Sequence, residues 1–105
     1  MANPQNTNSE PSGEVIIRTN RAGVHIGTMI ARNGQEIILK DARRLYSWAG
    51  AFTLNAVAMN GVDRSNSRIS IPVPKITLLE AIEIIPVSKG VDLSSTESGH
   101  RYISA

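Results

Sequence analysis

The dipeptide Asn33-Gly34 restricts the possible folds most, because it separates two segments that both have the pattern of β-strands. Residues 23–32 alternate β-branched residues with His, Gly, Met and Ala, and residues 35–39 form a second run rich in Ile and Leu. A type I′ hairpin turn needs positive φ at both central positions, and Asn-Gly suits that requirement well. The sequence therefore predicts an antiparallel hairpin whose turn is Asn33-Gly34.

Three further short segments have strand-like composition. Residues 14–19 contain three consecutive β-branched residues, residues 68–73 alternate with period two, and residues 81–87 are rich in Ile. Pro72 and Pro86 fall in the last two segments, and proline is tolerated in sheets mainly at edge strands and strand ends. We therefore expect these two segments to lie at sheet edges or to end at their prolines.

One short helix is expected between the strands, over residues 54–60. Thr53 is suited to cap its first turn, apolar residues follow at i, i+3 and i+4 spacing, and Gly61 is suited to end it. Residues 42–52 show no regular pattern. The fold class predicted is mainly β: a small barrel or rolled antiparallel sheet with one short helix.

Polar segments flank the apolar part of the chain at both ends. Residues 1–13 and 88–105 are dominated by Asn, Ser, Pro, Gly and other polar residues, which bury too little apolar area to offset the entropy lost on ordering. We therefore expect a flexible amino-terminal arm over 1–13, a single β-rich domain over 14–87, and a polar carboxyl-terminal arm over 88–105. No apolar run approaches the roughly 20 residues of a membrane span, so we expect no membrane partner.

Residues suited to catalysis or metal binding are scarce. The chain has no cysteine, and His25 and His100 stand neither at a metal-ligand spacing nor beside a carboxylate. No nucleophile-elbow sequence is present. Glu80 and Glu83 are better interpreted as a solvated strand face than as a pair for acid–base work. We therefore expect no enzyme, no metal site and no cofactor.

Gly23 and Gly27 bracket a Val-His-Ile tripeptide without the spacing of a phosphate-binding loop. Glycine inside a strand pattern is typical of a bulge or of close backbone packing. We therefore expect these glycines to allow close strand packing or a bulge rather than to bind phosphate.

The charges of the chain do not favour nucleic acid as a partner. Eleven Lys and Arg against nine Asp and Glu give a net charge of +2, and the basic residues are spread along the chain. Nucleic-acid affinity increases with the number of phosphates that a concentrated basic surface neutralises. We therefore do not expect nucleic acid as a partner.

One cluster is a candidate binding site. Tyr46, Trp48 and Phe52 directly follow Arg43 and Arg44, with small residues between them. Aromatic faces beside guanidinium groups stack bases and neutralise phosphates, which suits a nucleotide. The alternative, which we favour, is that Trp48 and Phe52 plug one end of the barrel while the others lie at its rim or at a subunit interface. The small residues let another backbone approach closely in either case.

Three motifs occur in order along the chain: GVHIG at residues 23–27, ARRLYSWAGAFTL at residues 42–54, and a segment ending in IEIIP at residues 82–86. Over about residues 14–87 the chain resembles a family of small phage-encoded proteins of unknown function. The resemblance implies a bacteriophage origin and assigns no site residues.

Two functions are compatible with these observations. The first is a non-catalytic structural or assembly protein, such as a capsid decoration or accessory protein of the virion, acting through contacts between its own copies or with other virion proteins. The alternative is an oligomeric small-ligand binder that sequesters a nucleotide immune signal with Arg43, Arg44, Tyr46 and Trp48. Both place the protein in the host cytoplasm during infection, and the first also places it in the virion.

Overall fold

The computed structural model describes residues 10–97 of the 105-residue chain, and its secondary structure is mainly β. The strands are β1 (Pro11–Thr19), β2 (Val24–Asn33), β3 (Glu36–Ser47), β4 (Arg68–Ile69), β5 (Val73–Leu78) and β6 (Ala81–Ser88). The helices are α1 (Leu54–Asn60) and a short 3-10 helix, η2 (Arg64–Asn66). These elements form one mainly β unit, as the sequence predicts.

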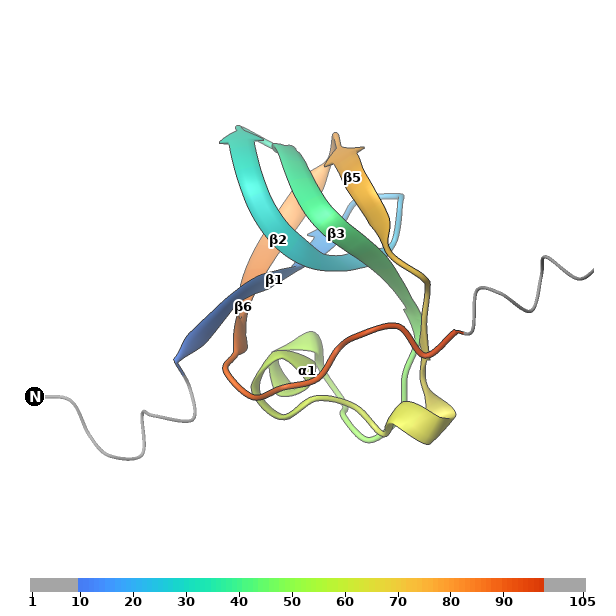
Figure 1. The fold of residues 1–105 in the computed structure, drawn as a ribbon. Coiled ribbons are helices and arrows are strands. Elements are labelled where there is room, and N and C mark those ends of the chain that lie inside the picture. The colour runs from blue at the N-terminus through green and yellow to red at the C-terminus, as the bar shows by residue number, and fades with distance from the viewer. Residues whose placement is uncertain (1–9, 98–105) are drawn as a thin grey trace, which may run out of the picture.

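The six strands form one antiparallel sheet that is rolled (Figure 1). Its order is β4-β3-β2-β1-β6, and β5 pairs with the same edge of β3 as β4 does, further toward the β2–β3 turn. Strands β5 and β6 lie at opposite edges of the sheet and are joined by a tight turn at residues 79–80. No pairing links these two strands in the described part of the chain. The rolled antiparallel sheet is therefore confirmed, and it does not close into a barrel.

The hairpin of β2 and β3 is confirmed, but its turn lies one residue further along than predicted. Asn33 pairs with Glu36, which leaves Gly34 and Gln35 as the loop. Gly34 has φ 62°, whereas neither Asn33 nor Gln35 has positive φ. Positive φ only at the first central residue is the pattern of a type II′ turn, for which glycine at that position is the requirement. The glycine of the Asn-Gly pair thus determines the turn.

Helix α1 begins and ends as predicted. The Thr53 hydroxyl accepts a hydrogen bond from the Ala56 amide at 3.1 Å, and the Gly61 amide donates to the Val57 carbonyl at 2.8 Å. Gly61 has φ 84°, a conformation that favours glycine. Val57 and Ala58 are the buried residues of the helix, and they face the sheet.

Both faces of the sheet are buried, each in a different part of the molecule. Consecutive residues Ile16 and Ile17 of β1 point to opposite faces and belong to different cores. The helix-side core consists of Ile16, Ile26, Leu45, Val57, Ala58, Ile69, Val87 and Leu93. The roll core, on the other face, consists of Ile17, Ile37, Leu39, Ala42, Leu78 and Ala81. In Figure 1, α1 and the segment after β6 lie at the end of the sheet opposite the β5–β6 turn.

The predicted strand over residues 68–73 is wrong as a single element. Only Arg68 and Ile69 pair, as β4, and a new strand, β5, begins at Val73 after Pro72. The proline that suggested an edge position therefore separates two strands. Pro86 lies in β6, which is at the edge of the sheet as expected, and the other terminal strand, β5, also contains a proline, Pro74.

The polar arms differ from the prediction where the structure describes them. Residues 11–13 belong to β1, and the Lys89 amide donates to the Glu10 carbonyl. Residues 88–97 are packed against the sheet, and Leu93 is fully buried. The reason is that backbone carbonyls of this polar segment bind arginine side chains, as described below. The rest of both predicted arms, residues 1–9 and 98–105, lies outside the described residues. Among the described helices, none has the length and apolar character needed to cross a membrane.

Gly27 confirms the expectation of close strand packing and a bulge. A Cβ atom at this position would lie 2.8 Å from the Lys40 carbonyl oxygen and 3.3 Å from the Ala42 Cα. The β2–β3 register shifts at the same place, between the Ile26 and Thr28 pairs, and Asp41 on the bulged strand has φ 52°. Gly23, in contrast, has φ 85° and open space around it.

We therefore expect Gly27→Ala to lower the free energy of unfolding by about 1–3 kcal/mol, because the added methyl group meets backbone atoms rather than a movable side chain. Urea denaturation monitored by circular dichroism measures the change. Ala31→Ser is the matched control, because it adds one heavy atom at an exposed position of the same strand. Equal stability of Gly27→Ala and the wild type would contradict this account of the sheet.

Candidate functional site

The two consecutive arginines of β3 point to opposite faces of the sheet. Arg43 is buried, with its guanidinium 2.9 Å from a Glu14 carboxylate oxygen. It also donates to the Asp41 carbonyl at 2.7 Å and to the Leu93 carbonyl at 3.1 Å. With these partners Arg43 anchors the segment after β6 to the sheet, and it is not free to bind a ligand.

Arg44 is exposed and fixed through its backbone to the segment after β4. Its amide donates to the Ser70 hydroxyl at 2.8 Å, and its carbonyl accepts from the Ser70 amide at 2.9 Å. Its guanidinium lies 3.2 Å from Nε2 of His25, across the β2–β3 pair. Among the described residues, no carboxylate forms an ion pair with Arg44.

His25 is a buried neutral ring beneath this arginine. A guanidinium only donates hydrogen bonds, so Nε2 accepts and the ring proton is on Nδ1. Nδ1 has no hydrogen-bond partner among the described residues. Burial, and secondarily the positive charge of Arg44, lowers the pKa of His25 from 6.5 to about 4. The ring is therefore uncharged at neutral pH.

These residues border a small hollow on the roll-core face, which we call the His25–Arg44 pocket. Its volume is about 290 Å³, and its lining is mainly apolar. Besides His25 and Arg44, the lining residues are Ala42, Arg43, Ser70, Ile71, Val73 and Ile76. The pocket thus combines aliphatic walls with one guanidinium that no carboxylate of the described chain neutralises.

The aromatic residues of the predicted cluster are separated from one another. Tyr46 is half-exposed, and its hydroxyl lies 3.5 Å from the Glu97 carboxylate. Trp48 packs against the helix-side core and donates from Nε1 to the Ala51 carbonyl at 3.2 Å. Phe52 is fully exposed. Trp48 therefore helps to fill the end of the sheet as expected, whereas the expectation that Phe52 plugs it is wrong.

The small residues between the aromatic ones are explained by the chain itself. A Cβ atom at Gly50 would lie 2.9 Å from the Asp63 amide nitrogen, and the Asp63 amide donates to the Ala49 carbonyl at 2.8 Å. Gly50 also has φ 88°. The backbone that approaches closely here is therefore the loop before η2, rather than a ligand or another subunit.

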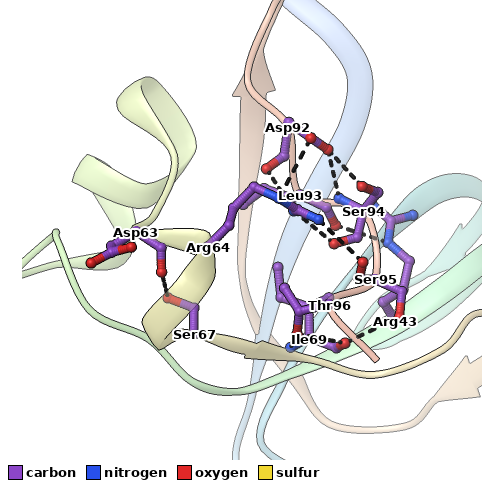
Figure 2. Close-up of polar contacts among 10 residues, drawn as sticks. All are labelled: Arg43, Asp63, Arg64, Ser67, Ile69, Asp92, Leu93, Ser94, Ser95 and Thr96. Carbon is purple, nitrogen blue, oxygen red and sulfur yellow. Dashed lines mark hydrogen bonds and ion pairs between the residues drawn. The ribbon is translucent and has the colours of Figure 1, made fainter. Parts of the chain in front are cut away.

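A second polar group, shown in Figure 2, fixes the segment after β6 and was missed from the sequence. Arg64 of η2 donates to the carbonyls of Asp92, Ser94 and Ser95 at 3.3, 2.9 and 3.1 Å. Thr96 exchanges hydrogen bonds with Ile69 of β4: its hydroxyl accepts from the Ile69 amide and its amide donates to the Ile69 carbonyl. This network orders residues 92–96, so it is structural.

The acidic residues considered from the sequence form ion pairs on the surface. Glu83 of β6 pairs with Arg18 of β1 at 2.8 Å. Glu80, between β5 and β6, pairs with Arg21, between β1 and β2, also at 2.8 Å. The interpretation of these carboxylates as a solvated face agrees with their exposure. No group of three His, Cys, Asp or Glu side chains suited to a metal ion occurs among residues 10–97.

The residues of the His25–Arg44 pocket come from segments far apart in the sequence, and only Arg43 and Arg44 were candidates before the structure. The lining residues that the sequence did not indicate are His25, Ala42, Ser70, Ile71, Val73 and Ile76. The local signal for them was absent, because the pairing of β3 with β4 and β5 brings them together.

Comparison with known proteins identifies a family and assigns no function. Residues 12–94 match the model of a family described as a domain of unknown function, DUF6948. The match covers most of the chain, so the chain belongs to this family. No curated protein and no solved structure matches significantly.

The Arg64 network should be measurable by hydrogen exchange. We expect Arg64→Ala to speed exchange of the Thr96 amide and to lower the free energy of unfolding by about 1–2 kcal/mol, because three carbonyls lose a charged donor. Arg64→Lys should recover only part of the loss, because one ammonium cannot reproduce the guanidinium fork. Arg68→Ala, which removes an exposed arginine of β4, is the control. Unchanged exchange at Thr96 in Arg64→Ala would contradict the network.

His25 should make stability fall in acid over a defined interval. The unfolded chain protonates this ring near pH 6.5 and the folded chain only near pH 4. Its contribution to stability is therefore complete above pH 6.5, declines by up to about 3 kcal/mol as the pH falls to about 4, and stays lost below that. The difference in unfolding free energy between wild type and His25→Gln, followed from pH 8 to 4, isolates this effect from the carboxylates.

The matched control for this titration is His100→Gln, which removes the other histidine of the chain. Comparison of the two variants assigns the loss of stability between pH 6.5 and 4 to one histidine or the other. A wild-type profile parallel to that of His25→Gln throughout would show that the ring titrates normally.

Proposed function

We propose that this chain is a non-catalytic phage structural or assembly protein, associated with the virion and acting through contacts between subunits. The observation that carries the proposal is the presence of large apolar side chains on the outer surface of a domain that already has two apolar cores. Phe52 is the extreme case, because its side chain is exposed in full.

A second exposed apolar group supports the same role. Tyr46, Ile71 and Val73 are each more than 40% exposed. They are neighbours, because Glu97 binds both Tyr46 and the Ile71 amide while Ile71 and Val73 line one pocket. Contiguous apolar surface on a small domain favours a protein partner, and aromatic residues are typical anchors of such contacts.

The resemblance found in the sequence implies a bacteriophage origin, and the virion is the place of assembly that we propose for such a protein. The alternative, sequestration of a nucleotide immune signal, has weaker support. It requires Arg43, Arg44, Tyr46 and Trp48 to converge, whereas Arg43 is buried in an ion pair and Trp48 is partly buried against the helix-side core. Only Arg44 and Tyr46 remain accessible for such a ligand.

Quantitative mass spectrometry of purified phage particles tests the proposal. We expect this chain in many copies per particle, in a fixed ratio to the major capsid protein, because a decoration or accessory protein occupies repeated sites. Particles purified in parallel from a phage that lacks the gene are the control for carry-over. Detection in the lysate of infected cells but not in purified particles would refute the virion role.

A further inference from the structure

Phe52 and the His25–Arg44 pocket are complementary surfaces of the same chain. Phe52 lies in the loop before α1, on the side of the sheet that carries the helix-side core, next to Ala51, which packs on that core. The pocket opens on the roll-core face, where Ala42 belongs to the roll core. The Phe52 side chain, which we call the knob, and the pocket thus lie on opposite sides of a subunit. They cannot meet within one molecule.

The chemistry of the pocket suits an aromatic ring. Ala42, Ile71, Val73 and Ile76 provide aliphatic walls, and the buried ring of His25 is uncharged at neutral pH. Arg44 lies at the pocket without a carboxylate partner among the described residues, and a guanidinium over an aromatic face gains a cation–π interaction. The volume of about 290 Å³ has room for one aromatic side chain.

Two other hollows of the described chain suit Phe52 less well. The hollow beside Arg43 is bordered by Glu14, Asp41 and Asp92, and the one near the β2–β3 turn includes Arg32 and Glu83. Carboxylates disfavour the negative face of an aromatic ring. Among the described residues, none that lines the His25–Arg44 pocket is acidic.

We propose that the exposed Phe52 ring of one copy inserts into the His25–Arg44 pocket of a second copy, which joins subunits head to tail. This inference rests on the assembly role proposed above and names its contact. Because the two surfaces differ, the contact is heterologous: it closes into a ring if the rotation between subunits allows closure and otherwise extends as a filament.

The contact is weak for an isolated pair and stronger in a closed assembly. One inserted aromatic side chain with its surroundings buries far less than the roughly 1,200–2,000 Å² of a stable pairwise interface. A subunit that makes two such contacts, one through its knob and one through its pocket, is held by both. Association should therefore depend steeply on protein concentration.

Sedimentation velocity over a wide range of protein concentration tests the inference. Phe52→Ser removes the knob, and Ile71→Arg blocks the pocket with a charge at an exposed position outside the strands. Each substitution should weaken association about 10- to 100-fold. Leu79→Ser is the matched control, because it removes an exposed apolar side chain from the β5–β6 turn, outside both surfaces, and should leave association unchanged.

Mixing the two defective variants gives the decisive result. Phe52→Ser retains the pocket and Ile71→Arg retains the knob, so at high protein concentration an equimolar mixture should form one-to-one dimers that do not grow, whereas each variant alone associates about 10- to 100-fold more weakly than the wild type. Circular dichroism and thermal unfolding establish that both variants are folded. A mixture that stays monomeric, or a Phe52→Ser variant that associates like the wild type, would overturn the inference.

A direct readout uses the photoreactive analogue p-benzoylphenylalanine in place of Phe52. Irradiation of mixed isotopically light and heavy copies should give cross-links between copies to Ile71, Val73 or Ile76. Cross-links elsewhere would assign the knob to another surface and refute the contact. A wild-type protein that is monomeric at every concentration would also refute the contact. The proposed virion role is tested separately, by mass spectrometry of particles, so failure of the contact would not refute it.

Discussion

The close approach of Gly27 to the backbone of β3 is the contact on which the rest of the architecture depends. It allows β3 to carry one extra residue at Asp41, so that the strand changes the face to which its later side chains point. Leu39 and Leu45 are six residues apart, which would place both on one face of a regular strand. Instead Leu39 belongs to the roll core and Leu45 to the helix-side core. One strand thereby serves both cores of a small domain.

The same change of face determines what the two arginines of β3 do. After the bulge, Arg43 shares the face of Leu45 and points at Glu14 and the Leu93 carbonyl, so its charge is used to hold the segment after β6. Arg44 shares the face of His25 and stays accessible. Two residues that are adjacent and chemically identical thus take a structural and a surface role. The difference comes from register alone, because strand neighbours face opposite ways.

Local signals in the sequence were sufficient for the elements that depend on local chemistry. The pairing of the two strands as a hairpin and the capped helix from Thr53 to Gly61 were predicted correctly, whereas the hairpin turn was predicted one residue too early, at Asn33-Gly34. The length of β3 and the identity of β5 were missed, since the bulge at Asp41 interrupts alternation and Pro72 divides what looked like one strand. The pocket around His25 was missed for a related reason: its members meet through pairing of strands far apart in sequence. The shift of one residue in the hairpin turn also shows that Gly34, rather than Asn33, sets the geometry.

Prolines in both terminal strands of the sheet restrict how copies of this chain associate. Pro74 in β5 and Pro86 in β6 each remove a backbone donor from an outermost strand, so neither edge offers an uninterrupted row of hydrogen-bonding groups to another chain. Growth by strand addition, the route to amyloid-like fibres, is therefore disfavoured at both edges. Copies are left to recognise one another through side chains, and contacts of that kind form and dissociate without any rearrangement of the sheet.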